Sequence, residues 1–179
     1  LRERKIPILI HCDLGNNKNN TKYLKLITSL FNHFPNNKII WAHIGGICPE
    51  LTNIPAYKHI NIISNILDKY KNVYIDLSWD SVHKIIKLDQ SSNNSINSID
   101  TVLNNANLYA SLFNKYSTRF LTGSDFVGSS EKIYEVYSSD VNVTSKIFRK
   151  LNNTAYRNIV LGNNFIKLYN LKYNVPLLK

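Results

Sequence analysis

The chain has no long apolar run, no methionine and little cysteine. No apolar segment in its 179 residues approaches the roughly 20 residues that a membrane-spanning helix needs, so we expect no membrane partner. Residues 1–5 are basic, but a short strand pattern follows them instead of the longer apolar stretch and small-residue cleavage site of a signal peptide. Because even position 1 is not methionine, we expect the chain to begin inside a longer one.

The two cysteines, Cys12 and Cys48, are too few for a small domain that is stabilised by several disulfides. They form no C-x-x-C pair and have no zinc-ribbon spacing, so neither motif predicts a metal site. Two thiols in a chain of this size fit a reducing compartment, and we therefore expect a cytoplasmic protein. We interpret both as buried apolar side chains.

Blocks of like charge are also absent, although the net charge is +10. A basic protein can bind nucleic acid, but here the lysines are scattered and no run of five or six gathers them. Asparagine makes up about one residue in seven, which indicates a compositional bias across the genome more than a binding face. We therefore expect no specific nucleic-acid partner.

Two glycine-dependent phosphate motifs are missing as well. The chain contains neither the G-x-G-x-x-G dinucleotide fingerprint nor a P-loop. Gly45-Gly46 is the one glycine pair after a strand pattern, and it is interpreted as a tight turn into a loop. The common nucleotide-binding sites are thus not predicted.

The pattern that is present alternates strands with helices. Apolar runs predict buried strands, and apolar residues at a spacing of three or four predict amphipathic helices. Strands buried on both faces indicate a parallel sheet covered by helices, so we expect one α/β domain over residues 1–179, either an open sheet or part of a (β/α)8 barrel. The expected strands are 6–11, 38–43, 72–77 and 119–124, and the expected helices are 21–34, 59–70, 81–88, 99–116, 131–137, 144–152 and 154–171.

Three of these strands end in residues that bind metals. His11, His43 and Asp125 each close an apolar run. The carboxyl ends of neighbouring parallel strands lie about 5 Å apart at one edge of the sheet, where the chemistry of parallel α/β folds is found. Imidazole and carboxylate suit zinc or a similar divalent ion, so this repetition predicts a shared metal site.

Asp125 has a second predicted role. A carboxylate beside activated water can accept its proton as a general base and return it as an acid. The alternative is that Asp125 caps the loop or helix that follows Ser124.

Further candidates lie near the third strand and after the first. Asp76, Ser78 and Trp79 could contact a small-molecule substrate, and Asp13 follows His11 closely enough to join the site. The remaining histidines fall on helical or loop segments and are interpreted as surface or packing residues. They are His33, His59 and His83.

In chain order, the segments WAHIGG, NVYIDLSWD, RFLTGSDF and IVLGNNFIKLYNL resemble the amidohydrolase-related branch of the amidohydrolase superfamily. The resemblance runs from about residue 6 to residue 171. It implies strands five to eight of a (β/α)8 barrel with a metal centre at the carboxyl edge. It also implies that Gly162-Asn163 begins the closing structural helix.

The resemblance carries specific roles to three residues. It implies that His11 is the strand-five metal ligand, that His43 is a strand-six ligand or substrate-polarising group, and that Asp125 is the strand-eight ligand and proton carrier. The implied activity is hydrolysis of an amide, ester or lactone by water activated on a divalent metal, most simply zinc. The loops at 48–58 and 80–98 would select the substrate.

One departure separates this chain from the family. The family's first strand carries His-x-His, and this chain contains no such motif. A barrel needs about 250 residues, so we expect strands one to four to come from a missing N-terminal half or from a homo-oligomer. Two alternatives stay open: a metal-dependent decarboxylase, and a non-catalytic remnant or interaction module.

Overall fold

A computed structural model of the chain describes residues 3, 6–16, 21–47, 54–78, 82, 97–125 and 134–176. Its centre is one sheet of four parallel strands in the order β1-β2-β3-β4. The α/β class and the parallel sheet predicted from the sequence are therefore confirmed. The strands are β1 (Ile8–Ile10), β2 (Ile39–Trp41), β3 (Val73–Ser78) and β4 (Phe120–Gly123).

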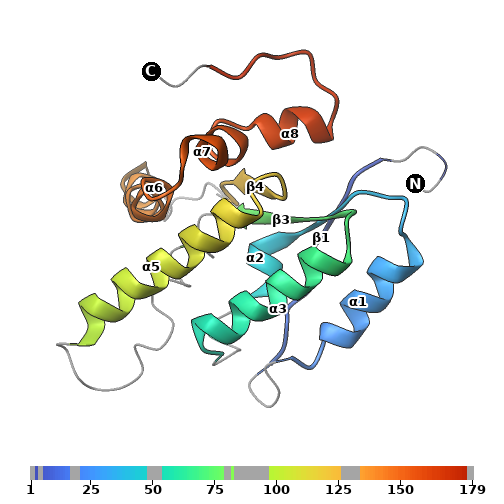
Figure 1. Ribbon diagram of the computed structural model, residues 1–179, viewed down its shortest axis with the longest axis horizontal. Helices are drawn as coiled ribbons and strands as arrows, with labels where there is room; N and C mark the ends of the chain where they lie inside the picture. The colour runs from blue at the N-terminus through green and yellow to red at the C-terminus, as the bar shows by residue number, and fades with distance from the viewer. Residues whose placement is uncertain are drawn as a thin grey trace.

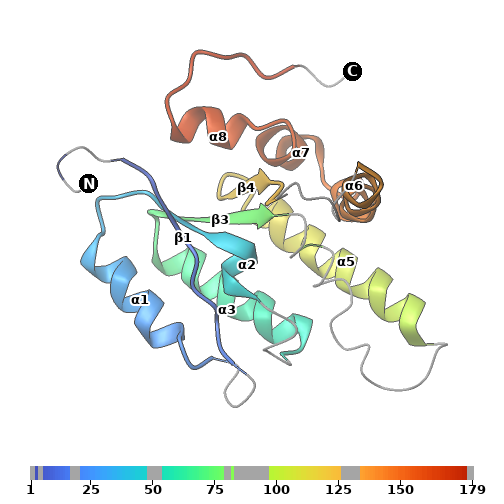
Figure 2. The ribbon, with the colours of Figure 1, turned by 180° about the vertical axis from the view of Figure 1, so that it is seen from behind.

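Seven helices of the described residues surround this sheet. In Figures 1 and 2, α1, α3 and α5 lie along one side of the strands, while α7 and α8 lie beyond the edge strand β4 and contact it. None of the helices in the described residues is long and apolar enough to span a bilayer. The helices are α1 (Leu24–His33), α2 (Ala42–Gly46), α3 (Ala56–Lys69), α5 (Asn97–Lys115), α6 (Tyr134–Phe148), α7 (Asn153–Ile159) and α8 (Asn163–Leu168).

The main core lies between the sheet and α1, α3 and α5. Alternate strand residues such as Trp41, Ile75 and Phe120 are fully buried on this side. The Phe31 ring of α1 meets Trp41 edge-on at 5.8 Å, and Phe113 of α5 lies 4.7 Å from Phe120. Burial of such large side chains is the main source of stability for this layer.

The other face of the sheet is less completely covered. Leu9 is 64% exposed, although its pairing neighbour Ile40 is only 4% exposed. The prediction that every strand is buried on both faces is therefore wrong for β1, which lies at the edge of the sheet. The sequence could not predict the exposure of Leu9, because the apolar residues of β1 are the same kind as those of an interior strand.

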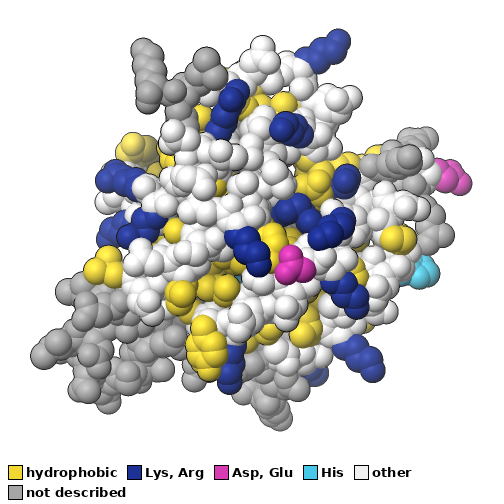
Figure 3. Space-filling view, viewed as in Figure 1, with side chains coloured by type: hydrophobic (Ala, Val, Ile, Leu, Met, Phe, Trp, Pro, Cys, Tyr) yellow, Lys and Arg dark blue, Asp and Glu magenta, His cyan; other side chains and the backbone are white. Residues whose placement is uncertain are grey.

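The outer surface is basic, as the composition requires. Lys and Arg side chains are many and acidic side chains few on the face seen in Figure 3, with polar and apolar side chains between them. The absence of a specific nucleic-acid partner stays a prediction.

Two helix boundaries differ from the sequence-based expectation. Within the described residues, a single helix α6 replaces the two helices expected at 131–137 and 144–152, and it ends at Phe148. Asn152 instead caps α7 by accepting a hydrogen bond from Ala155 N at 2.8 Å. The helix expected over 154–171 is broken at Gly162, whose φ of +80° cannot continue a right-handed helix. The predicted helix at 81–88 lies almost wholly outside the described residues.

His59 joins α3 to α5 inside the core. It is fully buried, and its Nδ1 atom lies 2.8 Å from the Tyr109 hydroxyl. Its Nε2 atom has no hydrogen bond of normal geometry to any described residue. Burial lowers the pKa of His59 to about 4, with the backbone of Ile44 acting weakly in the opposite direction.

We predict that the fold loses stability in acid between about pH 6.5 and pH 4. In this range the unfolded chain binds a proton at His59 and the folded chain does not, so acid favours unfolding by up to about 3 kcal/mol. Urea denaturation at pH 7 and pH 4.5 measures the difference. His59→Gln should lose most of this pH dependence, whereas His33→Gln, at an exposed position, should keep it. An unchanged dependence in His59→Gln would contradict the assignment.

Candidate metal centre and active site

One cleft brings the three predicted ligands together. His11, His43 and Asp125 all line a cavity of about 500 Å³ at the carboxyl edge of the sheet. Leu9 and Leu121 lie on the sheet side of this cavity. Other described lining residues include Ile40, Asp76, Gly123, and Phe165 and Tyr169 from the segment around α8.

The distances between these side chains show a convergent but open arrangement. The His11 and His43 rings meet edge-on with centroids 4.7 Å apart, and His43 Nδ1 lies 3.8 Å from Asp125 Oδ2. His11 and Asp125 are accessible, with 65% and 52% of their side chains exposed. Among the described residues, however, no three His, Cys, Asp or Glu side chains are already placed to hold a metal ion.

His43 lies on a strained turn. The sequence predicts a loop after the second strand, but α2 is a short turn in which His43, Ile44 and Gly45 all have left-handed φ and ψ angles. A left-handed conformation costs about 1–2 kcal/mol for a residue with a Cβ atom, and a β-branched residue such as Ile44 adopts it rarely. Asp125 is left-handed too, with φ of +47°. A strained backbone of this kind persists where the surrounding packing holds it in place, and such strain is often found at functional sites.

Two hydrogen bonds hold the loop after β1 against this turn. The Trp41 indole Nε1 donates to the Cys12 carbonyl, and the Leu14 amide donates to the Gly46 carbonyl, both at 2.7 Å. They fix the segment that follows His11 beside the turn that carries His43. No motif in the sequence marks Trp41 for this role. Burial raises the pKa of the Cys12 thiol, as expected for an unreactive cysteine.

Glycine is required at position 46 for a reason beyond its φ of +69°. A Cβ atom there would lie 1.9 Å from the Cys12 carbonyl oxygen, whereas one at Gly162, with φ of +80°, would meet nothing within 4 Å. Gly162→Ala should therefore lose about 1 kcal/mol from backbone strain alone. Gly46→Ala should lose at least about 2 kcal/mol more, because the two loops must separate. Urea denaturation measures both, and equal losses would contradict the close contact.

A part-buried hydrogen-bond chain selects the ring tautomer of His43. The Ser78 hydroxyl donates to Asp76 Oδ2 at 2.6 Å, and Ser78 Oγ also lies 2.8 Å from His43 Nδ1. Since Ser78 has one hydroxyl hydrogen and gives it to Asp76, its oxygen accepts from His43 Nδ1–H. The Nε2 atom of neutral His43 then carries a lone pair and acts as an acceptor or ligand.

Asp76 is packed closely at the base of this chain. Burial raises the pKa of its carboxyl, while the Ser78 hydroxyl, the His43 backbone amide and the His43 ring lower it, and nearby Asp125 raises it further. Its Oδ1 atom lies 2.6 Å from the point where a Cβ atom at Gly123 would stand. The absence of a side chain at Gly123 thus leaves room for the carboxylate.

The remaining candidates fall in different places. Ser78 is 1% exposed and engaged by two partners, so its position suits orientation of His43 better than contact with substrate. Asp76 lines the cleft, and Asp13 lies 3.4 Å from His11 Nε2. Trp79 and His83 lie outside the described residues, as do Cys48 and most of the loops expected to select the substrate.

Asn164 is a buried residue that was not predicted from the sequence to shape the site. Its Nδ2 atom donates to the carbonyls of Ser117 and Phe120, each at 2.8 Å. These bonds fix α8, and hence one side of the cleft, to the start of β4. No motif distinguishes this asparagine in a chain so rich in the residue.

We predict that Ser78→Ala disturbs His43 more than it disturbs the fold. Wild-type His43 should show the Nδ1–H tautomer at pH 7 in imidazole nitrogen NMR, and Ser78→Ala should give a mixture of tautomers because the acceptor is gone. Stability should fall by about 1–3 kcal/mol through loss of the buried hydrogen bonds. Ser111→Ala, on the exposed side of α5, is the matched control. An Nε2–H tautomer in the wild type would refute the proton assignment.

Comparisons with known proteins extend these observations. A family model described as amidohydrolase matches residues 1–170. The crystal structure of dihydroorotase from Campylobacter jejuni aligns with 97% of this chain at a TM-score of 0.55 and 18% identity. The chain spans about half of that protein, 51% of its length. No curated protein matches the chain significantly.

Proposed function

Because the chain belongs to the amidohydrolase family, we propose that the protein is a metal-dependent hydrolase in which activated water attacks an amide, ester or lactone of a small molecule. The observation that carries this proposal is the meeting of His11, His43 and Asp125 in one cleft from three separate strand ends. The similarity to dihydroorotase concerns the fold and supports a partial (β/α)8 barrel, in which we assign β1–β4 to strands five to eight.

The donor set fits a divalent cation. Two imidazoles and a carboxylate are ligands that zinc prefers, and the Ser78 contact leaves His43 Nε2 unprotonated, as a metal ligand requires. His11, His43 and Asp125 would hold the ion, together with donors that lie outside the described residues. The hydrogen bond to His43 Nδ1 is the kind of support that orients a ligating histidine.

Each residue has a distinct role in this proposal. A bound ion would lower the pKa of its water so that hydroxide is available near neutral pH. Asp125, half-exposed in the cleft, accepts the proton of the attacking water and returns it to the leaving group. His43 serves as a ligand and not as a donor to the substrate carbonyl, because its ring proton is committed to Ser78.

The whole protein needs more than these four strands. β1 and β4 are the edges of the sheet, and Leu9 on the open face is 64% exposed. Unpaired edges and bare apolar surface favour coverage by further strands. We propose that the other half of the barrel, from the same protein or from a second copy, completes both the core and the ligand set.

Metal analysis with matched variants tests the proposed function on the full-length protein. His11→Ala and His43→Ala should each weaken zinc binding at least about tenfold, because a ligand is lost. Asp125→Asn should lower hydrolysis of amide, ester or lactone substrates about 100-fold or more, because the proton carrier is lost. His33→Ala, at an exposed position on α1, should leave both properties unchanged.

Two results would contradict this proposal. Unchanged metal content in both His11→Ala and Asp125→Ala would remove the assigned site. Release of carbon dioxide from a substrate without consumption of water would identify a decarboxylase instead.

A further inference from the structure

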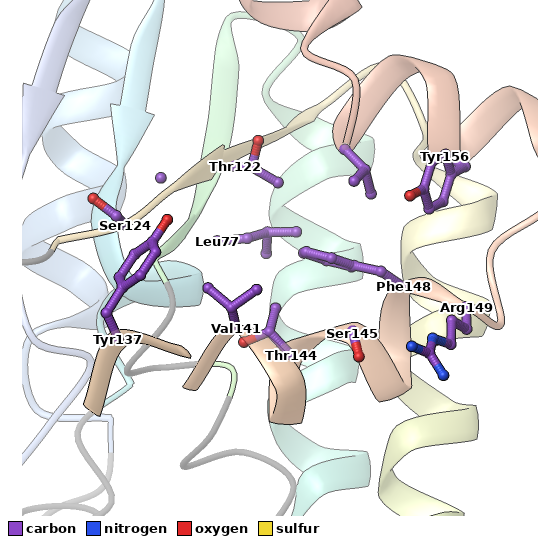
Figure 4. A pocket seen from close by; sticks show the side chains of 12 residues that line it. Leu77, Thr122, Ser124, Tyr137, Val141, Thr144, Ser145, Phe148, Arg149 and Tyr156 are labelled. Atoms are coloured by element: carbon purple, nitrogen blue, oxygen red, sulfur yellow. The ribbon is translucent and has the colours of Figure 1, made fainter. Parts of the chain in front are cut away.

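A second cavity lies on the other face of the sheet, and we propose that it binds a small carboxylate with an apolar body. It has a volume of about 560 Å³, within the range of ligand sites in proteins. It lies between the β3–β4 strand ends and the helices α6 and α7 (Figure 4). Because its use requires no metal and no hydrolysis, this inference is independent of the proposed function.

The cavity is separated from the catalytic cleft by the pleat of the sheet. Leu77 and Thr122 are paired neighbours on β3 and β4 that line this cavity, whereas the preceding pair, Asp76 and Leu121, lines the cleft. Successive residues of a strand point to opposite faces, so the two cavities lie on opposite sides. Among described lining residues they share Thr122 and Gly123 of the edge strand.

Most of the cavity wall can receive an apolar group. Tyr137, Val141 and Phe148 recur along one face of α6, and in Figure 4 Phe148 and Leu77 approach each other at the centre of the cavity. Val141 is 45% exposed and Tyr137 36% exposed, although both line the same cavity. A bound hydrocarbon would remove this apolar surface from water, which favours binding.

One end of the cavity is cationic and carries hydroxyl groups. Arg149 directly follows α6 at an exposed position, and its guanidinium has no ion pair or hydrogen bond to any described residue. Figure 4 shows it near the Ser145 hydroxyl, with the Tyr156 hydroxyl directed toward the cavity from α7. The Thr144 hydroxyl oxygen, on the same helix, is buried and without a hydrogen bond to a described residue.

These groups select a carboxylate. No described residue that lines the cavity is acidic. The planar guanidinium of Arg149 matches the two oxygens of a carboxylate in a bidentate pair, and the Tyr156 hydroxyl can donate to the same anion. A ligand with an aromatic or branched aliphatic body and a single carboxylate would therefore use both parts of the cavity.

Calorimetric titration of the full-length protein, with metal removed by chelation, tests the inference. The probes are 3-phenylpropionate and its neutral analogue 3-phenylpropionamide. The carboxylate should bind at least tenfold more tightly than the amide. Arg149→Gln should remove this difference by weakening the carboxylate alone, and Val141→Trp should weaken both probes by filling the cavity. Lys150→Gln removes the adjacent charge, at a position that does not line the cavity, and should change neither affinity.

Three results would overturn the inference: no binding of either probe at millimolar concentration, equal affinity for acid and amide, or equal losses in Arg149→Gln and Lys150→Gln. The last would mean that general surface charge attracts the anion. Circular dichroism of each variant separates misfolding from loss of the site. Because metal is absent throughout, failure here would leave the proposed hydrolysis untouched, and failure of hydrolysis would leave this result untouched.

Discussion

The register of the four parallel strands constrains every other feature of this protein. Ile10 pairs with Trp41, Trp41 with Ile75, and Ser78 with Gly123, so all four strands finish at the same edge. Parallel pairing requires that each strand be followed by a crossover, and here the crossovers are helical. The segments that follow the strands are consequently free of sheet hydrogen bonds, and they carry His11, His43 and Asp125 of the cleft.

The cleft is held by few, well-buried contacts rather than by many ion pairs. The Trp41 indole fixes the Cys12 carbonyl, Gly46 allows the two loops to touch, and Ser78 joins His43 to Asp76. Each contact uses a group that is buried or part-buried, where hydrogen bonds are strong and unsatisfied partners are costly. The left-handed turn at His43 is stable because these neighbours leave it no better conformation.

Sequence patterns located the elements well where the pattern is strong and local. The strands lie within or nearly within the predicted ranges, and α1, α3 and α5 follow the predicted apolar spacing. Errors arose where a single residue overrides the pattern. Asn152 caps the start of α7. Gly162 ends the helical conformation, although the apolar spacing of the sequence continues on both sides of it. The exposure of Leu9 depends on its place at the edge of the sheet, which strand order alone decides.

By itself the sequence determined the alternation of strands and helices, the family, and the candidates at the strand ends, because apolar periodicity and short motifs are encoded locally. The tertiary structure alone decided that the His11 and His43 rings touch, that His43 Nδ1–H donates a hydrogen bond to Ser78, and that Asp76 is buried beside them. It also revealed the cavity that ends at Arg149. These features join residues tens of positions apart, and the distances between such residues are fixed only when the strands pair and the helices pack against them.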